Sequence, residues 1–201
     1  MSSTDPGTDA DDAKALVALC RKGRLYDIEK WISAGKSLDI SAATKRGRQR
    51  SLLEIAVEIG FHSLVELIAK HEAHQSAKDA ALIDAVSSRR LDLVELLLAN
   101  GADFKSVPLA DVLLTWEPKL IQFFLDHGAD PVEGRPFAEA FGAKVRTALR
   151  PFVEYKRAHP ELATQLQEQL DCALRHFCAE GDLKWVSLLM WAGGAPRSRG
   201  P

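Results

Sequence analysis

One basic segment holds the residues best suited to binding another molecule. The sequence Thr-Lys-Arg-Gly-Arg-Gln-Arg at residues 44–50 places four cations within seven residues. Each arginine can donate paired hydrogen bonds that match the oxygens of a carboxylate or a phosphate. The same composition also suits a turn whose cations are only hydrated, and Gly47 adds backbone freedom. The segment therefore predicts either a site for an acidic ligand or a solvated loop.

Charge is distributed unevenly around this segment. Residues 13–50 contain ten Lys and Arg against three Asp and Glu, whereas residues 51–201 contain sixteen against twenty-one. The formal net charge of -2 gives the whole chain no general attraction to nucleic acid or to a membrane surface. The acidic remainder would repel a long polyanion, which disfavours nucleic acid as the partner.

Residues 1–12 read as an acidic tail. They carry Asp5, Asp9, Asp11 and Asp12 and contain no apolar segment, so we expect disorder and no secretory signal. These carboxylates could occupy the basic segment until a partner displaces them. No run of about 18 apolar residues follows anywhere in the chain, so no membrane-spanning helix is expected.

The other residue types capable of chemistry form no catalytic pattern. His71 and His74 lie three residues apart, but two histidines fall short of a metal site, and partly charged caps of a helix C-terminus explain them better. Cys20, Cys172 and Cys178 lack disulfide spacing and fall on apolar helical faces, which predicts buried, reduced thiols in the cytoplasm. Without a phosphate-binding glycine loop, a Gly-x-Ser-x-Gly elbow or a His-Glu-x-x-His motif, we expect no enzyme, no cofactor and no metal.

The elements that would position these residues are short helices with a built-in stop. Residues 91–103 read Leu-Asp-Leu-Val-Glu-Leu-Leu-Leu-Ala-Asn-Gly-Ala-Asp, an apolar helix that Gly101 ends. Because it is apolar on nearly every side, this helix must be covered by neighbours. Similar segments occur at residues 26–35, 64–73, 120–131 and 185–194. Self-similarity at this period indicates a solenoid, whose core should include the four tryptophans, Trp31, Trp116, Trp185 and Trp191.

A second, shorter helical segment precedes each of these helices and carries a family resemblance. Residues 51–60 and 107–114 resemble the Thr-Pro-Leu-His-x-Ala first helix of ankyrin repeats, and the following helix with Gly-Ala-Asp resembles that family's second helix and exit turn. The resemblance assigns a buried leucine and a small residue to the first helices, namely Leu53, Leu82, Leu109 and Leu174, with Ala56 and Ala85. Its twelve-residue glycine spacing recurs from Gly23 to Gly35 and from Gly181 to Gly193, with Arg89 and Trp116 in place of the first glycine elsewhere.

The resemblance implies an all-α fold, an α-solenoid of stacked helix-turn-helix ankyrin-like repeats with short or absent β-hairpin fingers. We expect the array to span residues 13–196, followed by a disordered end at 197–201. Pro151 should kink one helix or shift its start, and a longer helix should begin at Pro160. The approximate repeats are 13–40, 41–74, 75–104, 105–131, 132–160 and 161–196.

The resemblance also implies a non-catalytic protein–protein interaction module that binds its partner on the concave face. By this resemblance the face consists of the turns and inner surfaces of the first helices, and its basic finger favours a protein with an acidic patch. The predicted partner-binding residues are Arg21, Lys22, Lys45, Arg46, Arg48, Arg50, Glu58 and Ile59. The alternative is a nucleic-acid- or phospholigand-binding protein that uses the Lys45–Arg50 loop.

The last helix raises a separate expectation. Repeat arrays need terminal repeats with a polar outer face, yet the final unit offers Trp185, Leu188, Leu189 and Trp191. We therefore expect this C-terminal face either to be the cut end of a longer array or to pair with another molecule, including a second copy.

Overall fold

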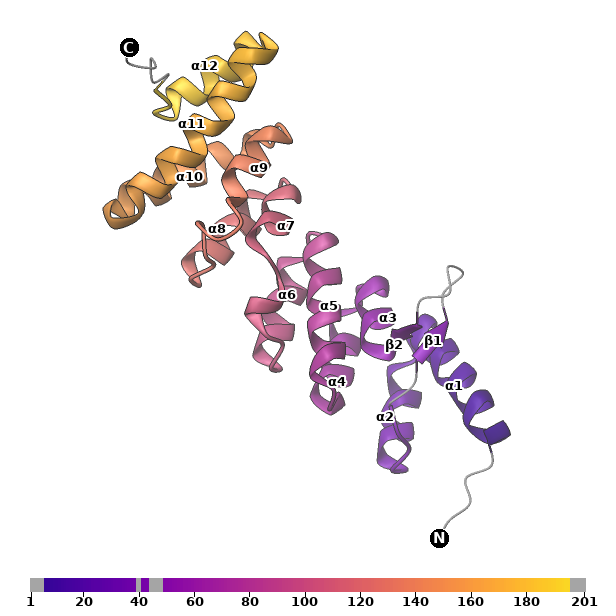
Figure 1. The fold of residues 1–201 in the computed structure, drawn as a ribbon. Coiled ribbons are helices and arrows are strands. Elements are labelled where there is room, and N and C mark those ends of the chain that lie inside the picture. Colours follow the sequence, from indigo (N-terminus) through magenta and orange to yellow (C-terminus); the bar gives the residue numbers. More distant parts are fainter. Residues whose placement is uncertain (1–5, 39–40, 44–48, 196–201) are drawn as a thin grey trace. The chain divides into compact units, whose positions relative to one another are not determined.

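The computed structural model describes residues 6–38, 41–43 and 49–195. The described chain consists of paired helices that fall into two compact units, divided between Val107 and Pro108 (Figure 1). Each unit contains three consecutive helix pairs, numbered here as repeats one to six. Lys45, Arg46 and Arg48 of the basic segment lie outside the described residues.

Unit 1 contains repeats one to three. Its first helices α1, α3 and α5 contact one another in sequence order, and its second helices α2, α4 and α6 do the same. A two-stranded antiparallel hairpin, in which Ala42 pairs with Arg50, leads into repeat two. The elements are α1 (Pro6–Arg21), α2 (Leu25–Ser33), β1 (Ser41–Ala43), β2 (Gln49–Ser51), α3 (Leu52–Ile59), α4 (His62–His71), α5 (Gln75–Ser87), α6 (Leu91–Ala99) and the 3-10 helix η1 (Phe104–Ser106).

Unit 2 contains repeats four to six. Helices α7, α9 and α11 contact in order, α8 contacts α10, and α11 packs along α12. Pro151 is the third residue of α10, whose start is shifted as expected. The elements are α7 (Leu109–Leu114), α8 (Pro118–Asp126), α9 (Pro136–Gly142), η2 (Arg146–Ala148), α10 (Leu149–Ala158), η3 (Pro160–Leu162), α11 (Ala163–Glu180) and α12 (Leu183–Trp191).

One residue with positive φ separates the two helices of every repeat. Arg89 and Trp116 adopt this conformation at 58° and 63°, which confirms that they stand in for glycine. Lys144, at 62°, does so in repeat five, where the sequence offered no glycine to mark the turn. The six turn residues are Gly23, Gly60, Arg89, Trp116, Lys144 and Gly181. They define equivalent positions in all repeats. A positive φ strains the backbone of a non-glycine residue, so such a residue occurs there only where the surrounding packing fixes the turn.

The exit turn after the second helix departs from this regularity in repeat two. Gly35, Gly101 and Gly128 have positive φ, but Glu72 does not. The Glu72 carboxylate is buried and accepts hydrogen bonds from the backbone N–H and the ring Nδ1 of His74, at 2.9 and 3.1 Å. His74 therefore interacts with a carboxylate of the turn, and its assignment as a cap of the helix C-terminus was wrong.

Two side chains of the first helix of repeat three, a glutamine and an aspartate four residues later, form hydrogen bonds to the turn that follows the second helix of the same repeat. Gln75 Nε2 donates to Asp79 Oδ1 at 2.8 Å and to the carbonyl of Gly101 at 3.0 Å. Asp79 Oδ1 also accepts from the backbone N–H of Asp103 at 2.8 Å. The pair thus satisfies polar backbone groups that a turn otherwise leaves to solvent.

Repeat six repeats this arrangement at the same spacing. Gln167 Nε2 donates to Asp171 Oδ1 at 2.7 Å and to the carbonyl of Gly193 at 3.0 Å. Asp171 Oδ1 accepts from the backbone N–H of Ala195 at 3.1 Å. We call this Gln-x-x-x-Asp arrangement the turn latch.

Two polar links join repeats five and six. The buried Gln169 of α11 accepts from the backbone N–H of Phe137 at 3.0 Å and donates to the carbonyl of Pro131 at 2.7 Å. Gln169 therefore supplies the start of α9 with the hydrogen bond that its own N-cap residue lacks. The second link joins Lys144 Nζ to Asp182 at 2.7 Å, and the Lys144 hydrogen bond lowers the pKa of the Asp182 carboxyl.

One expectation about the start of the chain was wrong, and one about the core is confirmed. Helix α1 begins at Pro6, so residues 6–12 are helical and their assignment to a disordered tail was wrong. Proline suits the first turn of a helix, and an acidic start suits its positive end. The leucines and alanines that the resemblance assigned to the core of the first helices are all buried, as expected.

The turn latch predicts a measurable stability difference between two similar glutamines. Gln75→Ala removes a hydrogen bond to Asp79 and one to the exit turn, and should lower the free energy of unfolding by about 1 kcal/mol. Gln122→Ala is the control, because Gln122 makes the same i,i+4 bond to Asp126 at 2.7 Å and does not bond a turn carbonyl within the described residues; its loss should be about 0.2–0.5 kcal/mol. Urea titration by circular dichroism measures both, and equal losses would contradict the latch.

Candidate functional site

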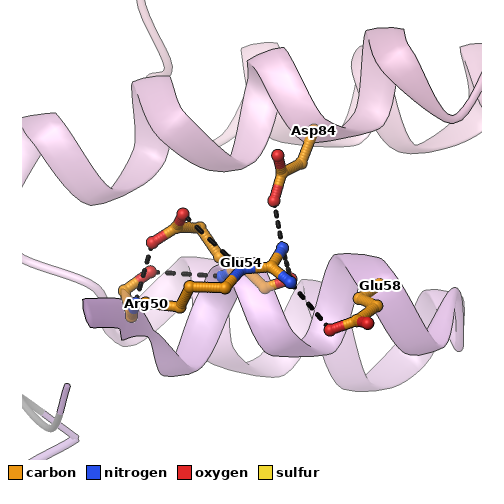
Figure 2. Close-up of polar contacts among 5 residues, drawn as sticks. Arg50, Glu54, Glu58 and Asp84 are labelled. Carbon is orange, nitrogen blue, oxygen red and sulfur yellow. Dashed lines mark hydrogen bonds and ion pairs between the residues drawn. The ribbon is translucent and has the colours of Figure 1, made fainter. Parts of the chain in front are cut away.

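Arg50 lies at the centre of a polar network in unit 1 rather than on an open surface. It is the middle residue of β2, and its side chain is 18% exposed between α3 and α5 (Figure 2). Its guanidinium donates to Glu58 Oε2 at 2.7 Å, to the carboxylate of Asp84, and to the backbone carbonyl of Glu54 at 3.3 Å. The Glu54 carboxylate lies 3.8 Å from Arg50 Nε.

The same network fixes the start of α3. The Ser51 side chain accepts from the backbone N–H of Glu54 at 3.2 Å, and the Glu54 carboxylate accepts from the backbone N–H of Ser51 at 2.8 Å. This reciprocal capping box holds the buried Glu54 next to Arg50. Because Asp84 belongs to α5, Arg50 joins repeat two to repeat three.

The sequence predicted that Arg50 binds a partner, and these contacts give it a structural role as well. Its donors already face three carboxylates of its own chain, so a partner's carboxylate would have to displace one of them. The sequence did not indicate this network because Asp84 lies 34 residues away, and only the fold brings it to Arg50. In the sequence, only the carboxylates of Glu54 and Glu58, four and eight residues after Arg50, could have indicated that Arg50 pairs within its own chain.

The other predicted residues of this face occupy equivalent positions on adjacent first helices. Arg21 and Glu58 precede their turn residues by two positions, and Lys22 and Ile59 precede them by one. All four are exposed, Ile59 to 38%. The structure therefore brings the ends of α1 and α3 together in one strip, because α1 contacts α3.

Two apolar side chains near this strip were missed in the sequence. Ile83 of α5 is 41% exposed and precedes Asp84, and Phe61 at the N-cap of α4 is 44% exposed. Phe61 lies beside the turn of repeat one, where a Cβ at Gly23 would be 4.0 Å from its Cδ1. An isoleucine within a helix predicts core, so its outward position depends on the helix register that packing sets.

The acidic start of the chain does not contact the described part of the basic segment. Asp12 forms an ion pair with Lys36 at 3.1 Å, and Asp11 lies 3.7 Å from Lys14. These two carboxylates thus interact with lysines of repeat one. The proposed occupation of the basic segment by Asp5 and Asp9 concerns residues whose side chains lie outside the described part.

The C-terminal face differs from its prediction residue by residue. Trp185 and Leu189 are buried at 6% and 0% exposure, and the Trp185 ring stacks on Phe177 with centroids 5.4 Å apart, so both residues were wrongly placed on an open face. Leu188 is half-buried, whereas Trp191 is 66% exposed. The exposure of Trp191 and of Trp116, at 42%, also contradicts their assignment to the core.

The cysteines likewise separate into two classes. Cys20 is buried between the helices of unit 1, and burial raises the pKa of its thiol to about 12. Cys172 and Cys178 are exposed on α11, so their predicted burial was wrong. The error arose because α11 keeps part of its surface exposed beside the parts packed against α9 and α12, and both cysteines lie on the exposed part.

A shallow cavity of about 220 Å³ lies on the first-helix side of repeats five and six. Its walls carry two cations, two carboxylates and a thiol, so it offers neither an apolar pocket nor a single sign of charge. Within the described residues no group of three potential ligands could hold a metal ion. The lining residues are Arg135, Glu168, Asp171, Cys172 and Arg175.

Comparison with solved structures identifies the fold. The chain is similar to the ankyrin repeat domain of Bcl-3, a unique member of the IκB protein family, with a TM-score of 0.59 and 18% sequence identity over 90% of this chain and 86% of that chain. The predicted fold class, an all-α solenoid of ankyrin-like repeats, is thereby confirmed. No family model and no curated protein matches the sequence. None of the helices in the described residues is long and apolar enough to cross a membrane.

The Arg50 network predicts a larger stability loss than an exposed ion pair. Arg50→Gln leaves the carboxylates of Glu54, Glu58 and Asp84 without their cation and should lower the free energy of unfolding by about 2–3 kcal/mol. Lys36→Gln is the control within the same unit, since the Lys36–Asp12 pair is 46% and 42% exposed; its loss should stay below about 1 kcal/mol. Urea titration of both variants gives the comparison, and similar losses would show that Arg50 is only hydrated.

The cysteine environments predict selective alkylation. At pH 8 and low protein concentration, iodoacetamide should modify Cys172 rapidly and leave Cys20 unmodified, because a buried thiol with a pKa near 12 presents almost no thiolate. Peptide mass spectrometry measures both rates. Cys20 should react at the rate of Cys172 once urea unfolds the chain, and equal rates in the folded chain would refute its burial.

Proposed function

We propose that this chain is a non-catalytic protein-interaction module whose partner binds across the first helices of unit 1. The observation that carries the proposal is the pair of exposed isoleucines, Ile59 and Ile83, on neighbouring first helices. Exposed apolar side chains within a polar surround provide the anchors typical of protein interfaces. We call this surface the first-helix face; it comprises Arg21, Lys22, Glu58, Ile59 and Ile83, and we propose that the segment Lys45–Arg48, which lies outside the described residues, contributes to it.

The charge of the first-helix face supports a partner with an acidic patch. Arg21 and Lys22 are exposed at the end of α1, and Lys45, Arg46 and Arg48 add three cations from the segment before repeat two. We do not include Arg50 among these cations, because its guanidinium already bonds carboxylates of repeats two and three. A partner segment with an apolar side chain between carboxylates fits the remaining residues.

The alternative, a nucleic acid or phospholigand bound by the Lys45–Arg50 loop, is less well supported. Three carboxylates, those of Glu54, Glu58 and Asp84, surround the single guanidinium of Arg50 at the base of this loop. They leave the base of the loop with a net negative charge, which opposes a polyanion.

Among the described residues the cysteines are unpaired, which supports a cytoplasmic, reducing environment.

Site-specific photo-crosslinking tests the first-helix face. A benzophenone amino acid at Ile59 should crosslink a protein partner in a lysate of the source cells, whereas the same group at Glu95, exposed on the second helix α6, should not. The triple reversal K45E/R46E/R48E should reduce the Ile59 crosslink at least tenfold, because it removes the cations that face the partner's carboxylates. The readout is the crosslinked mass identified by mass spectrometry.

A matched charge reversal controls for a general effect of net charge. The variant K119E/R146E/R157E changes the charge equally at exposed positions of unit 2 and should retain the crosslink. Crosslinks of equal yield from Ile59 and Glu95, or a crosslink that survives K45E/R46E/R48E, would refute the proposed face. Recovery of nucleic acid at Ile59 would instead establish the alternative.

A further inference from the structure

The C-terminal end of unit 2 exposes a position that is buried in the repeats before it. This position lies three residues before the turn residue, and its side chain is at most 2% exposed in repeats one, two, four and five. The residues there are, in that order, Cys20, Val57, Leu113 and Phe141. Its counterpart in repeat six is Cys178, which is exposed. In the earlier repeats this side of the first helix contacts the first helix of the next repeat, as α7 contacts α9 and α9 contacts α11.

The second helix of repeat six shows the same change. The residue nine places after the turn residue is buried in repeats two and four, as Ala69 and Leu125, and half-buried in repeats one, three and five, but Met190 is 51% exposed. The residue five places after it is fully buried in repeat four, as Ile121, whereas Val186 is only half-buried. No element in the described part of the chain takes the place of a following repeat here.

Two further apolar residues extend this surface along α12. Leu183, which lies seven positions from Met190 and on the same side of α12, is 77% exposed. Trp191 directly follows Met190, is 66% exposed and lies about 100° further around the helix. Polar residues, Lys70 and Asp126, occupy the position of Trp191 in repeats two and four. We call Cys178, Leu183, Val186, Met190 and Trp191 the end face.

We propose that the end face binds the end face of a second copy of this chain, forming a two-fold dimer. None of its five side chains carries a charge, so the same surface can meet its copy without like-charge repulsion at the centre. Tryptophan and methionine are the residue types enriched at the centre of protein interfaces. At the rim, Glu180 and Lys184 are both exposed, which allows a two-fold axis to set opposite charges against each other.

The other end of the array explains why the copies should pair face to face. Where repeats two, three and four bury Leu64, Leu93 and Leu120, repeat one carries Asp27, which forms an ion pair with Arg24 at 2.7 Å. A head-to-tail contact would cover this carboxylate and remove its pair from water, which is costly. Self-association through one apolar end and not the other gives a closed dimer instead of a filament.

Sedimentation velocity of the full chain tests the dimer. Over about 1–100 µM the mass should rise from the 22.1 kDa of one chain toward twice that value. Met190→Lys and Trp191→Lys should each weaken the dimer at least tenfold, because each places a cation against its own copy. Tyr26→Lys is the matched control, since Tyr26 is 65% exposed but belongs to repeat one, and it should leave the association unchanged.

Thiol protection gives a second readout that distinguishes the end face from other contacts. At high concentration, alkylation of Cys178 should slow at least tenfold relative to low concentration, whereas Cys172 on the same helix should react at a constant rate. A monomer at every concentration, a dimer that Met190→Lys and Trp191→Lys leave intact, or an unprotected Cys178 would each overturn the proposal. A monomer whose Cys178 becomes reactive only after removal of residues 196–201 would show that the chain's own end occupies the face.

Discussion

No helix pair in this chain can bury its own apolar side chains. Helix α6 spans nine residues, a length at which an isolated helix is marginal in water, yet Leu93, Val94, Leu96 and Leu97 are all buried. Their burial comes from α4 and α5, with which α6 is in contact. Stability in such an array is a property of neighbouring pairs more than of single repeats. Every side chain's exposure therefore depends on whether another repeat follows it.

This dependence also determines where polar groups are structural. A polar side chain at a boundary between repeats loses water, so it must find partners within the protein. Arg50 does so with carboxylates of repeats two and three, and Gln169 with backbone groups of repeat five. Both side chains link adjacent repeats through these hydrogen bonds. Residues such as Arg21 and Lys22, which remain exposed after stacking, are the better candidates for recognition.

Local patterns in the sequence were sufficient for the repeat itself. The apolar helix before Gly101, the serine at the start of α3 and the substitution of Arg89 and Trp116 for glycine all follow from properties within one repeat. Contacts between repeats could not be predicted in this way. The pairing of Arg50 with Asp84 requires the stack, and Trp185 and Trp191 on one helix have opposite exposures because only one of them faces α11. For the same reason the basic segment was recognised but the network around Arg50 was not.

Cys20 and Cys178 show how strongly the next repeat controls chemistry at a fixed position. Both are cysteines three residues before a turn glycine, so composition and local geometry are matched. Helix α3 follows the first and buries it, which raises the pKa of its thiol to about 12. The second meets solvent because none of the described residues packs there. A position that is core between repeats is thus exposed where no described repeat packs against it, with no change of residue type.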